Sequence, residues 1–365
     1  MRLPFRILKF RFDMPLFLGL VVLCAVSLLI LYSAGGANSA QLVRQLTRIA
    51  AGLGLMLVVA QISPASWRRY SPIIYSLGMV MLVVVLAVGF IGKGAQRWID
   101  LGVIRFQPSE AMKLAVPMMV AWTATQRFLP LPVWYIGVCF VVIAVPAGLI
   151  GLQPDLGTAL LVSFAGLVVI FLAGISWKII VALLAVVSVS APLVWQFVFH
   201  DYQRRRVLTL FDPWQDPLGA GYHTIQSMIA IGSGGKTGKG WLHGTQAQLD
   251  FIPERTTDFI FSVFGEEFGL LGFILLLCIY LFLVFRGIMI AFYAQETYDR
   301  LLAGSIILTF MFYVFVNIGM VSGILPVVGV PLPLVSYGGT SMLTLMVGFG
   351  MLMSIHSEGR KLSRT

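Results

Sequence analysis

A lone carboxylate stands where the one long polar segment of the chain ends and an apolar run begins. Asp258 follows the polar residues 253–257 and precedes the apolar run Phe259–Phe285. Ionisable groups at membrane depth are costly and usually functional, so Asp258 is a candidate general base, a role that a positioned carboxylate can perform. The alternative is that Asp258 only stabilises a helix N-terminus. Its position alone does not choose between the two roles.

A second group of polar side chains precedes another apolar run. It supplies three cations, Lys93, Arg97 and Arg105, before the predicted fourth span. Glu110 and Lys113 follow at positions i and i+3, so they share one face of the predicted helix. The pair is interpreted either as an ion pair that fixes helix packing or as part of a substrate site, and the two roles are compatible.

The pattern Gln-Pro followed by an acid recurs at Asp155, again at the end of an apolar run. Further cations lie in the segment 200–256, which is far longer than an ordinary connection and is therefore either functional or disordered. Its apolar stretch 222–231 favours order. Arg204–Arg206 and Lys236 are suited to phosphate groups, and contact with lipid headgroups is the alternative.

The same segment holds an incomplete phosphate-loop pattern. Residues 230–237 read AIGSGGKT, and Ala230 occupies the first glycine position of the pattern. No strand–helix unit surrounds the stretch. We interpret the match as a coincidence, and its glycines as permitting tight turns near a ligand.

Composition predicts an all-α polytopic membrane protein. Of the 365 residues, 59% are hydrophobic and 11% are charged, whereas soluble domains have about 25% charged residues. Apolar runs of membrane-spanning length recur along the chain. We expect one domain, 1–365, whose first span is an uncleaved anchor, and three cysteines that only pack. The ten predicted spans are 14–34, 44–62, 72–91, 109–125, 132–151, 156–174, 177–199, 257–285, 301–323 and 338–356.

Two connections in this arrangement are unusual. The large extracytoplasmic loop 200–256 joins the seventh and eighth spans. The segment 323–339, GILPVVGVPLPLVSYGG, joins the ninth and tenth, and its prolines and glycines break helix in an apolar context. Irregular backbone at membrane depth is tolerated where it is buried or lines a cavity, so a re-entrant loop is predicted, with Ser336 as a candidate contact. A hydrophobic surface connector is the alternative.

Charge sets the predicted orientation. With the six cations of the large loop set aside, 13 Lys/Arg lie inside and 6 outside when both termini are cytoplasmic, which agrees with the positive-inside rule. Eleven of the fifteen acids then lie on or near the outer face. We therefore expect the outer face to be the working face.

Helix geometry isolates Asp258 from the acids that follow it. On a helix starting at residue 257, Ser262 and Gly265 share its face, whereas Glu266 and Glu267 do not. A continuous helix to Phe285 would be about 42 Å long, more than one bilayer core requires. It is therefore expected to project from the membrane or to bend near Gly265 or Gly269.

A lone carboxylate, several cations and apolar walls suit a lipid-linked anionic substrate. Cations would hold a diphosphate, and grooves between helices would hold its lipid tail. No dedicated metal site is expected, because no His/Cys/Asp/Glu cluster has ligand spacing. A divalent cation, Mg²⁺ or Mn²⁺, would travel with the diphosphate. No nucleic acid is expected as a partner.

Five long segments resemble the SEDS (shape, elongation, division and sporulation) family. They are GKGAQRWIDLG…RFQPSE (92–110), QPDLGT (153–158), FDPWQDPLGAGYHTIQSMIAIGSGG (211–235), PERTTDFIFSVFGEEFG (253–269) and the segment 323–339. The resemblance covers nearly the whole chain, and the last segment is similar to the elongation branch of the family rather than to the division branch.

The resemblance implies a peptidoglycan glycosyltransferase of the inner membrane that polymerises lipid II on the periplasmic face and releases undecaprenyl diphosphate. The essential aspartate of the family falls on Asp258, and its intramembrane ion pair falls on Glu110 and Lys113. The expected partners are a class B penicillin-binding transpeptidase and membrane lipids. The remaining substrate-binding candidates are Arg97, Trp98, Arg105, Gln107, Asp155, Lys236 and Ser336.

Two other functions are compatible with a membrane protein of this kind. A lipid II flippase predicts ionisable groups near the midplane and paired broken helices, whereas the charges here gather at one face. A non-catalytic scaffold of the elongation machinery predicts that Asp258 is dispensable. Polymerisation of lipid II with and without Asp258→Ala separates the three.

Overall fold

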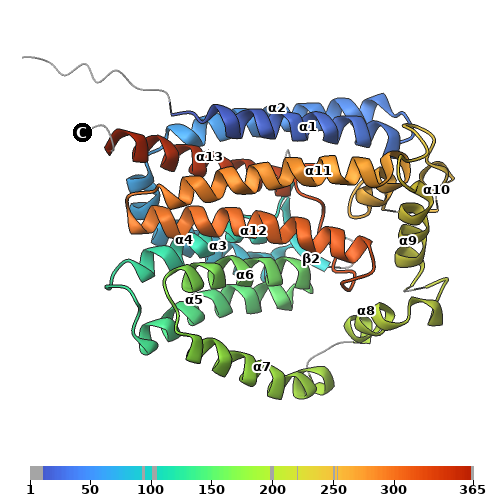
Figure 1. Ribbon diagram of the computed structural model, residues 1–365. Coiled ribbons are helices and arrows are strands. Elements are labelled where there is room, and N and C mark those ends of the chain that lie inside the picture. Colours follow the sequence, from blue (N-terminus) through green and yellow to red (C-terminus); the bar gives the residue numbers. More distant parts are fainter. Residues whose placement is uncertain are drawn as a thin grey trace, which may run out of the picture.

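A computed structural model describes residues 11–92, 95–100, 105–197, 201–219, 221–249, 251–252 and 254–362. The chain forms a bundle of long helices (Figure 1). The helices are α1 (Met14–Ala34), α2 (Ser39–Gln61), α3 (Pro64–Val88), α4 (Pro108–Ala124), α5 (Val133–Leu152), α6 (Leu156–Leu172), α7 (Trp177–Phe197), α8 (Asp201–Phe211), α9 (Tyr222–Gly234), α10 (Thr245–Gln248), α11 (Ile260–Phe292), α12 (Thr297–Val321) and α13 (Thr340–Leu362), with a 3-10 turn, η1 (Pro213–Gln215).

The all-α polytopic architecture is confirmed. In the described part of the chain, eight helices are long and apolar enough to cross a membrane. The helix α6 is apolar but has 17 residues, as has α4. The count of ten spans therefore stays a prediction, although each predicted span overlaps one long helix.

Capping residues account for where several helices begin. The side chains of Asp13, Asn38, Ser63 and Asp155 accept a hydrogen bond from a backbone N–H in the first turn of α1, α2, α3 and α6, which satisfies donors that helix starts leave unpaired. The cap at Asn38 starts α2 five residues before the predicted span. Hydropathy missed this turn because it is polar.

The segment after α3 was not predicted to contain strands. It forms an antiparallel ribbon of β1 (Phe90–Gly92), β2 (Ala95–Asp100) and β3 (Arg105–Phe106), in the order β1-β2-β3. Phe90 pairs with Trp98, and Ile99 pairs with Phe106. The ribbon leads directly into α4, so it carries the residues around Arg97 to the end of that helix.

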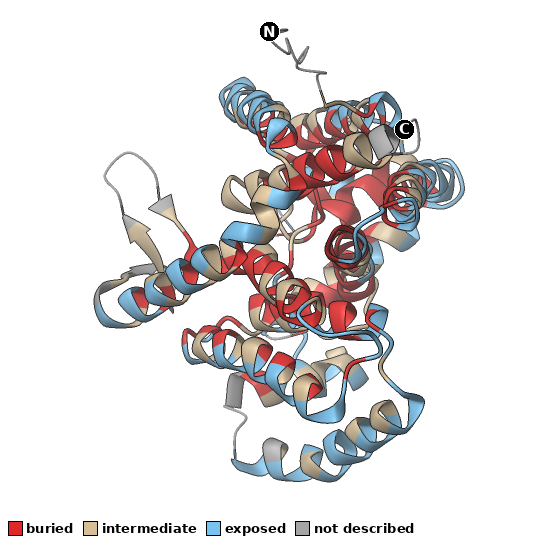
Figure 2. Cartoon of the chain, turned by 90° about the vertical axis from the view of Figure 1, so that its left-hand side faces the viewer, coloured by how far each residue is buried: buried red, intermediate tan, exposed pale blue. Residues whose placement is uncertain are grey.

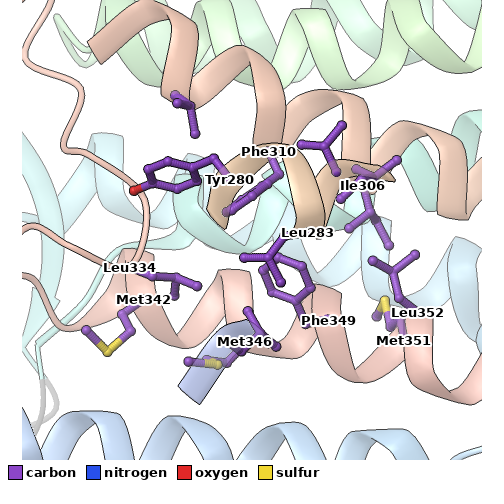
Figure 3. Packing of buried hydrophobic residues seen from close by; sticks show 14 of the residues in the cluster. Tyr280, Leu283, Ile306, Phe310, Leu334, Met342, Met346, Phe349, Met351 and Leu352 are labelled. Carbon is purple, nitrogen blue, oxygen red and sulfur yellow. The ribbon is translucent and has the colours of Figure 1, made fainter. Parts of the chain in front are cut away.

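The core lies where α11, α12 and α13 meet. The rings of Tyr280 and Phe310 have centroids 5.8 Å apart, and those of Phe310 and Phe349 are 5.0 Å apart and nearly perpendicular (Figure 3). Buried residues lie toward the middle of the bundle (Figure 2), and most residues of α12 and α4 are buried. By contrast, α7 lies apart from the bundle in both views, and its apolar window has no buried residue. The apolar surface of α7 suits contact with lipid.

The helix α11 bends sharply at Gly269, one of the two bend positions that the sequence predicts. Gly269 has φ +59° and ψ −156°, outside the helical region. Along a straight helix, residues 261 and 273 would be about 18 Å apart, yet the rings of Phe261 and Phe273 have centroids 5.6 Å apart. The axis therefore turns at Gly269 and brings the two rings together.

The glycine-rich stretch after α9 fills this bend. The N–H groups of Lys239 and Gly240 donate to the carbonyls of Glu266 and Glu267, both at 3.0 Å. Leu270 and Leu271 donate in return to the carbonyls of residues 235 and 236, at 3.0 and 3.1 Å. The loop thus satisfies backbone groups that the bend leaves unpaired.

Glycine is required at this crossing. A Cβ at Gly238 would lie 2.0 Å from the Glu267 carbonyl oxygen, and one at Gly234 would lie 2.0 Å from that of Gly265. Backbone packs directly on backbone here. Within the incomplete phosphate-loop pattern, Gly234 therefore has a structural explanation, because it permits close approach to α11.

The segment 322–339 contains no helix and lies inside the bundle. Val330 and residues 332–336 are buried. Side chains from the surrounding helices donate to its carbonyls: Ser27 Oγ to Val335 at 2.9 Å and Tyr280 Oη to Pro333 at 2.7 Å, and Figure 3 shows Tyr280 pointing toward this loop. Such pairing is what irregular backbone needs away from water. A surface connector does not fit this burial, and the depth of the loop in the membrane stays a prediction.

Candidate functional site

Asp258 lies in a turn before α11 rather than on the helix. The N–H groups of Thr257 and Phe259 donate to the carbonyl of Glu254 at 3.1 and 3.2 Å, and α11 begins at Ile260. The predicted helical face shared with Ser262 is therefore wrong. The helix starts later than hydropathy indicates, because the turn 254–259 closes its own hydrogen bonds. Asp258 itself is half-buried.

The turn that carries Asp258 is bound to the buried loop 322–339. Ser336 Oγ donates to the carbonyl of Thr257 at 2.6 Å, and the N–H of Tyr337 donates to that of Thr256 at 2.8 Å. Both anchors come from one loop, and both hold the backbone next to Asp258. The predicted candidate Ser336 is thus joined to Asp258 through the backbone of the turn.

A third anchor comes from α12. Asn317 Nδ2 donates to the carbonyls of Asp258, at 2.9 Å, and of Val330, at 2.7 Å. The Asn317 side chain is fully buried. One amide therefore joins the turn to the loop, so the backbone of Asp258 is fixed from two sides.

The carboxylate of Asp258 faces a glycine. A Cβ at Gly329 would lie 3.4 Å from Asp258 Oδ2, and Gly329 has φ +73°. Only glycine adopts this conformation without strain. The loop backbone therefore approaches Asp258 closely at this position.

A second polar cluster connects the β ribbon to the start of α6. Arg97 Nε donates to the carbonyl of Gln153 at 3.1 Å, and its Nη2 donates to that of Pro154. Arg97 Nη1 lies 3.9 Å from Asp155 Oδ2, to which Gln107 Nε2 donates at 3.0 Å. Asp155 also caps α6 through Oδ1. The structure thus brings together three predicted residues from distant parts of the chain.

The predicted ion pair of α4 is present. Lys113 Nζ lies 2.6 Å from Glu110 Oε1, and both side chains are buried. Lys113 Nζ also lies 4.9 Å from the centre of the Tyr313 ring, on α12. A buried charge needs such partners, because desolvation is costly. The pair therefore ties α4 to α12.

Two contacts place this pair and the second cluster near Asp258. Tyr313 stands one helical turn before Asn317 on α12, so one helix contacts both Lys113 and the Asp258 turn. At the start of α6, a Cβ at Gly157 would lie 2.9 Å from the carbonyl oxygen of Val328, the residue before Gly329. The polar groups thus border the same loop.

Three predicted residues are not joined to Asp258 by any described contact. Lys236 is exposed at the bend of α11, where its carbonyl accepts from Leu271. Trp98 is half-buried on β2. Arg105 belongs to β3, and its side chain lies outside the described part of the structure.

The acids after Asp258 have partners in other segments. Glu266 is fully buried and accepts from Lys239 Nζ at 2.7 Å and from Thr245 Oγ1 at 3.0 Å. Glu267 accepts from Ser33 on α1. Glu266 thus holds the loop that fills the bend of α11, and Glu267 joins α11 to α1.

A histidine that sequence reasoning missed lies beside the turn. The ring of His223, on α9, stacks on that of Phe259 with centroids 5.6 Å apart. Burial lowers the pKa of His223 below its usual value, and the Glu254 carboxylate opposes this shift. Its Nδ1 is buried without a hydrogen-bond partner among the described residues. No local pattern singled it out, because its partner lies 36 positions away along the chain.

The described residues contain no group of three His, Cys, Asp or Glu side chains that could hold a metal ion. Any divalent cation would have to come with a substrate, and this stays a prediction.

A helical bundle in which the turn of Asp258 is fixed against a buried loop defines a polytopic membrane protein with polar groups gathered among its helices. The family model described as "Cell cycle protein", which joins FtsW, RodA and SpoVE, matches residues 6–361. The chain belongs to this family. The branch of the family is indicated by the relatives that follow.

The chain is 52% identical to peptidoglycan glycosyltransferase MrdB of Escherichia coli K12 over 357 residues, which are 98% of this chain and 96% of the relative. A solved peptidoglycan synthase complex, described as coordinating polymerization and crosslinking, contains a chain that is 34% identical, with a TM-score of 0.84. The match covers 95% of this chain and 98% of that chain. The crystal structure of the rod shape determining protein RodA of Thermus thermophilus matches with a TM-score of 0.71 and 28% identity. The match covers 95% of this chain and 97% of that chain.

Proposed function

We propose that the chain is a peptidoglycan glycosyltransferase of the inner membrane, active on the periplasmic face during cell elongation. It joins the disaccharide–pentapeptide units of lipid II into β-1,4 glycan strands and releases undecaprenyl diphosphate. The relatives named as peptidoglycan glycosyltransferases support the activity. The observation that carries the mechanism is the fixed turn of Asp258, held by Ser336, Tyr337 and Asn317.

In the proposed reaction Asp258 removes the proton from the 4-hydroxyl of the acceptor sugar. The oxygen forms a bond to the anomeric carbon of the donor, and the bond from that carbon to the diphosphate breaks, its electron pair leaving on the diphosphate. The configuration inverts from α to β. Because hydrogen bonds already fix the backbone on both sides of Asp258, little reorganisation is needed for catalysis.

The leaving diphosphate is proposed to lie on the side of Arg97 and Lys113. Two donors of Arg97 serve backbone carbonyls, while Nη1 stands 3.9 Å from Asp155 and keeps N–H groups for a phosphate. Arg105 and Lys236 are proposed to add positive charge, with Mg²⁺ or Mn²⁺ carried by the diphosphate. Lys113 is proposed to act through its pair with Glu110.

The proposed protein partner is a class B penicillin-binding transpeptidase, which would crosslink the new strands. The similar chain in a complex described as coordinating polymerization and crosslinking supports this assembly. The proposed orientation has both termini in the cytoplasm, in agreement with the count of cations in short loops.

The test uses purified protein with its transpeptidase partner and lipid II in detergent. The parent is expected to make glycan polymer, and Asp258→Ala and Asp258→Asn are expected to make none while keeping the melting temperature of the parent. Polymer from an Asp258 variant would contradict the assigned base. Absence of polymer from the folded parent would favour a flippase or a scaffold.

A further inference from the structure

Arg48 lies at a depth where an arginine needs a partner. The helix α2 begins at Ser39, so Arg48 stands about 14 Å along its axis from that end. It shares this end of the molecule with Asp258, because Tyr337 contacts both Arg48 and the Asp258 turn. Charged side chains within membrane helices are rare and mark substrate or ion pathways.

The partner of Arg48 is the aromatic ring of Tyr337 rather than a carboxylate. The Arg48 guanidinium lies over the ring of Tyr337, 4.4 Å from its centre, and the half-buried side chain receives no carboxylate among the described residues. Arg286, near the other end of the bundle, lies 2.5 Å from Asp13. Stacking on a ring leaves the N–H edge of a guanidinium open. Arg48 is therefore oriented but keeps its hydrogen-bond donors.

The backbone next to Arg48 is open at Gly338. A Cβ at Gly338 would meet no atom within 4 Å, and one at Gly339 would lie 3.7 Å from Arg48 Nε. The helix α13 begins directly afterwards, at Thr340, and the backbone N–H groups of a helix start attract anions. An arginine fork and a helix N-terminus thus border the open space at Gly338.

A buried polar group beside Arg48 is also unsatisfied. Gln45, three residues earlier on α2, is fully buried, and its Oε1 has no hydrogen-bond partner in the described part of the chain. Its Nε2 lies 3.5 Å from the carbonyl of Ser336. Unpaired buried amides are costly. Because an amide oxygen only accepts hydrogen bonds, a bound molecule would satisfy it through a hydroxyl or N–H group and not through a diphosphate.

The position of Arg48 relative to Asp258 indicates which molecule would bind there. The N–H of Tyr337 donates to Thr256, two residues before Asp258, so Arg48 is separated from the carboxylate by one tyrosine and a short turn. Polymerisation, as proposed above, uses two lipid-linked diphosphates. The donor diphosphate leaves from the reacting carbon itself. The acceptor diphosphate lies one disaccharide away from the hydroxyl that Asp258 deprotonates.

We propose that Arg48, held by Tyr337 and assisted by the start of α13, binds the diphosphate of the acceptor lipid. The site lies on the α2 side of the loop 322–339, whereas the cluster of Arg97, Asp155 and Lys113 lies on the α4 and α6 side. The two sides would hold the two lipids with Asp258 between them. This assignment rests on the proposed polymerase function and gives that function an acceptor site.

The experiment measures binding and turnover separately. Undecaprenyl diphosphate in detergent is titrated into the purified full chain and followed by native mass spectrometry. The parent is expected to bind two molecules. Arg48→Ala is expected to keep one and to bind the second about 10- to 100-fold more weakly, as expected for loss of charge-assisted hydrogen bonds. In polymerisation the variant should raise KM for lipid II by a similar factor with little change in kcat, whereas a merely structural defect would lower kcat.

The matched control is Arg69→Ala, because Arg69 also lies over a tyrosine ring, 5.9 Å from that of Tyr70, on another helix. It should leave both lipids bound. Arg48→Lys keeps the positive charge but lacks the paired N–H donors of the guanidinium, so it should bind the second lipid with part of the parent affinity. This variant tests the proposal if Arg48→Ala does not fold. Two molecules bound with parent affinity by the folded Arg48 variants would overturn the proposal. If the parent binds two lipids but makes no polymer, the polymerase function fails and the anion site stands.

Discussion

Asn317 binds the carbonyl of Asp258 and the carbonyl of Val330 through the same nitrogen, at 2.9 and 2.7 Å. The backbone of Asp258 is thereby joined to the buried loop 322–339. The residue that joins them, Asn317 on α12, is fully buried. The backbone of Asp258 is thus held from two sides. The position of the proposed base depends on α12 and the loop that follows it, whose anchoring residues lie about 60 to 80 positions further along the chain.

Removing that joint should uncouple the base from the loop. Asn317→Ala leaves two buried carbonyls without their donor, which costs about 1–3 kcal/mol of unfolding free energy. We expect polymerisation to fall on the order of 100-fold, because a small displacement of a catalytic group has effects of this size. Thermal unfolding and polymer yield from lipid II measure the two effects.

The control is Thr309→Val on the same helix, since Thr309 Oγ1 has no partner among the described residues. This variant should keep both the melting temperature and the polymer yield. Parent-like polymerisation by Asn317→Ala would show that the joint does not position Asp258.

Gly329→Ala should impair activity by crowding the carboxylate. The new Cβ would lie 3.4 Å from Asp258 Oδ2, and φ +73° is unfavourable for alanine by about 1–2 kcal/mol. We expect a lower melting temperature and a loss of polymerisation that exceeds what the loss of folded protein explains. In Gly54→Ala, the control, a Cβ on α2 meets nothing within 4 Å. An active Gly329→Ala would contradict the close approach.

The bend of α11 should not tolerate a side chain at Gly269. A Cβ there would lie 2.5 Å from the backbone nitrogen of Gly238, and φ is +59°. Gly269→Ala should therefore expel the loop 234–240 and expose its backbone to hydrogen exchange, with a large fall in melting temperature. Gly137→Ala, whose Cβ meets nothing within 4 Å, is the control. Unchanged protection of the loop would argue against its role in closing the bend.

His223 should make stability depend on pH. Burial lowers its pKa in the folded state, so the unfolded state binds more protons between that value and the ordinary one, about 6.5. The stabilisation is complete above the unfolded pKa and is lost as the pH falls toward the folded pKa. We expect His223→Phe, which preserves stacking on Phe259, to flatten the fall in melting temperature between about pH 7 and pH 5.

The control is His243→Phe, which removes an exposed ring without altering the contact with Phe259. Glu254 also interacts with His223, so Glu254→Gln tests whether the carboxylate changes the slope. An identical slope in the parent and His223→Phe would show that another group titrates.

The sequence by itself determined the membrane class, the candidate base Asp258 and the pair of Glu110 and Lys113, and it indicated Gly269 as one of two positions for a bend in a helix that could otherwise project from the membrane. These depend on local properties: hydropathy over about 20 residues, i and i+3 spacing on a helix, and the helix length that a bilayer accepts. The break of helix in 323–339 was also predictable from its prolines and glycines, whereas the choice between a re-entrant loop and a surface connector was left open by the sequence.

Only the tertiary structure decided what surrounds Asp258. The turn 254–259 closes on itself and takes its anchors from Asn317, Ser336 and Tyr337, which lie about 60 to 80 residues away in the sequence. Gly234 and Gly238 acquired their explanation from a bend about 30 residues later, and Arg48 acquired its partner from the far end of the chain. Such contacts follow from how the helices pack together, and no local pattern of hydropathy or charge encodes which distant segments will meet.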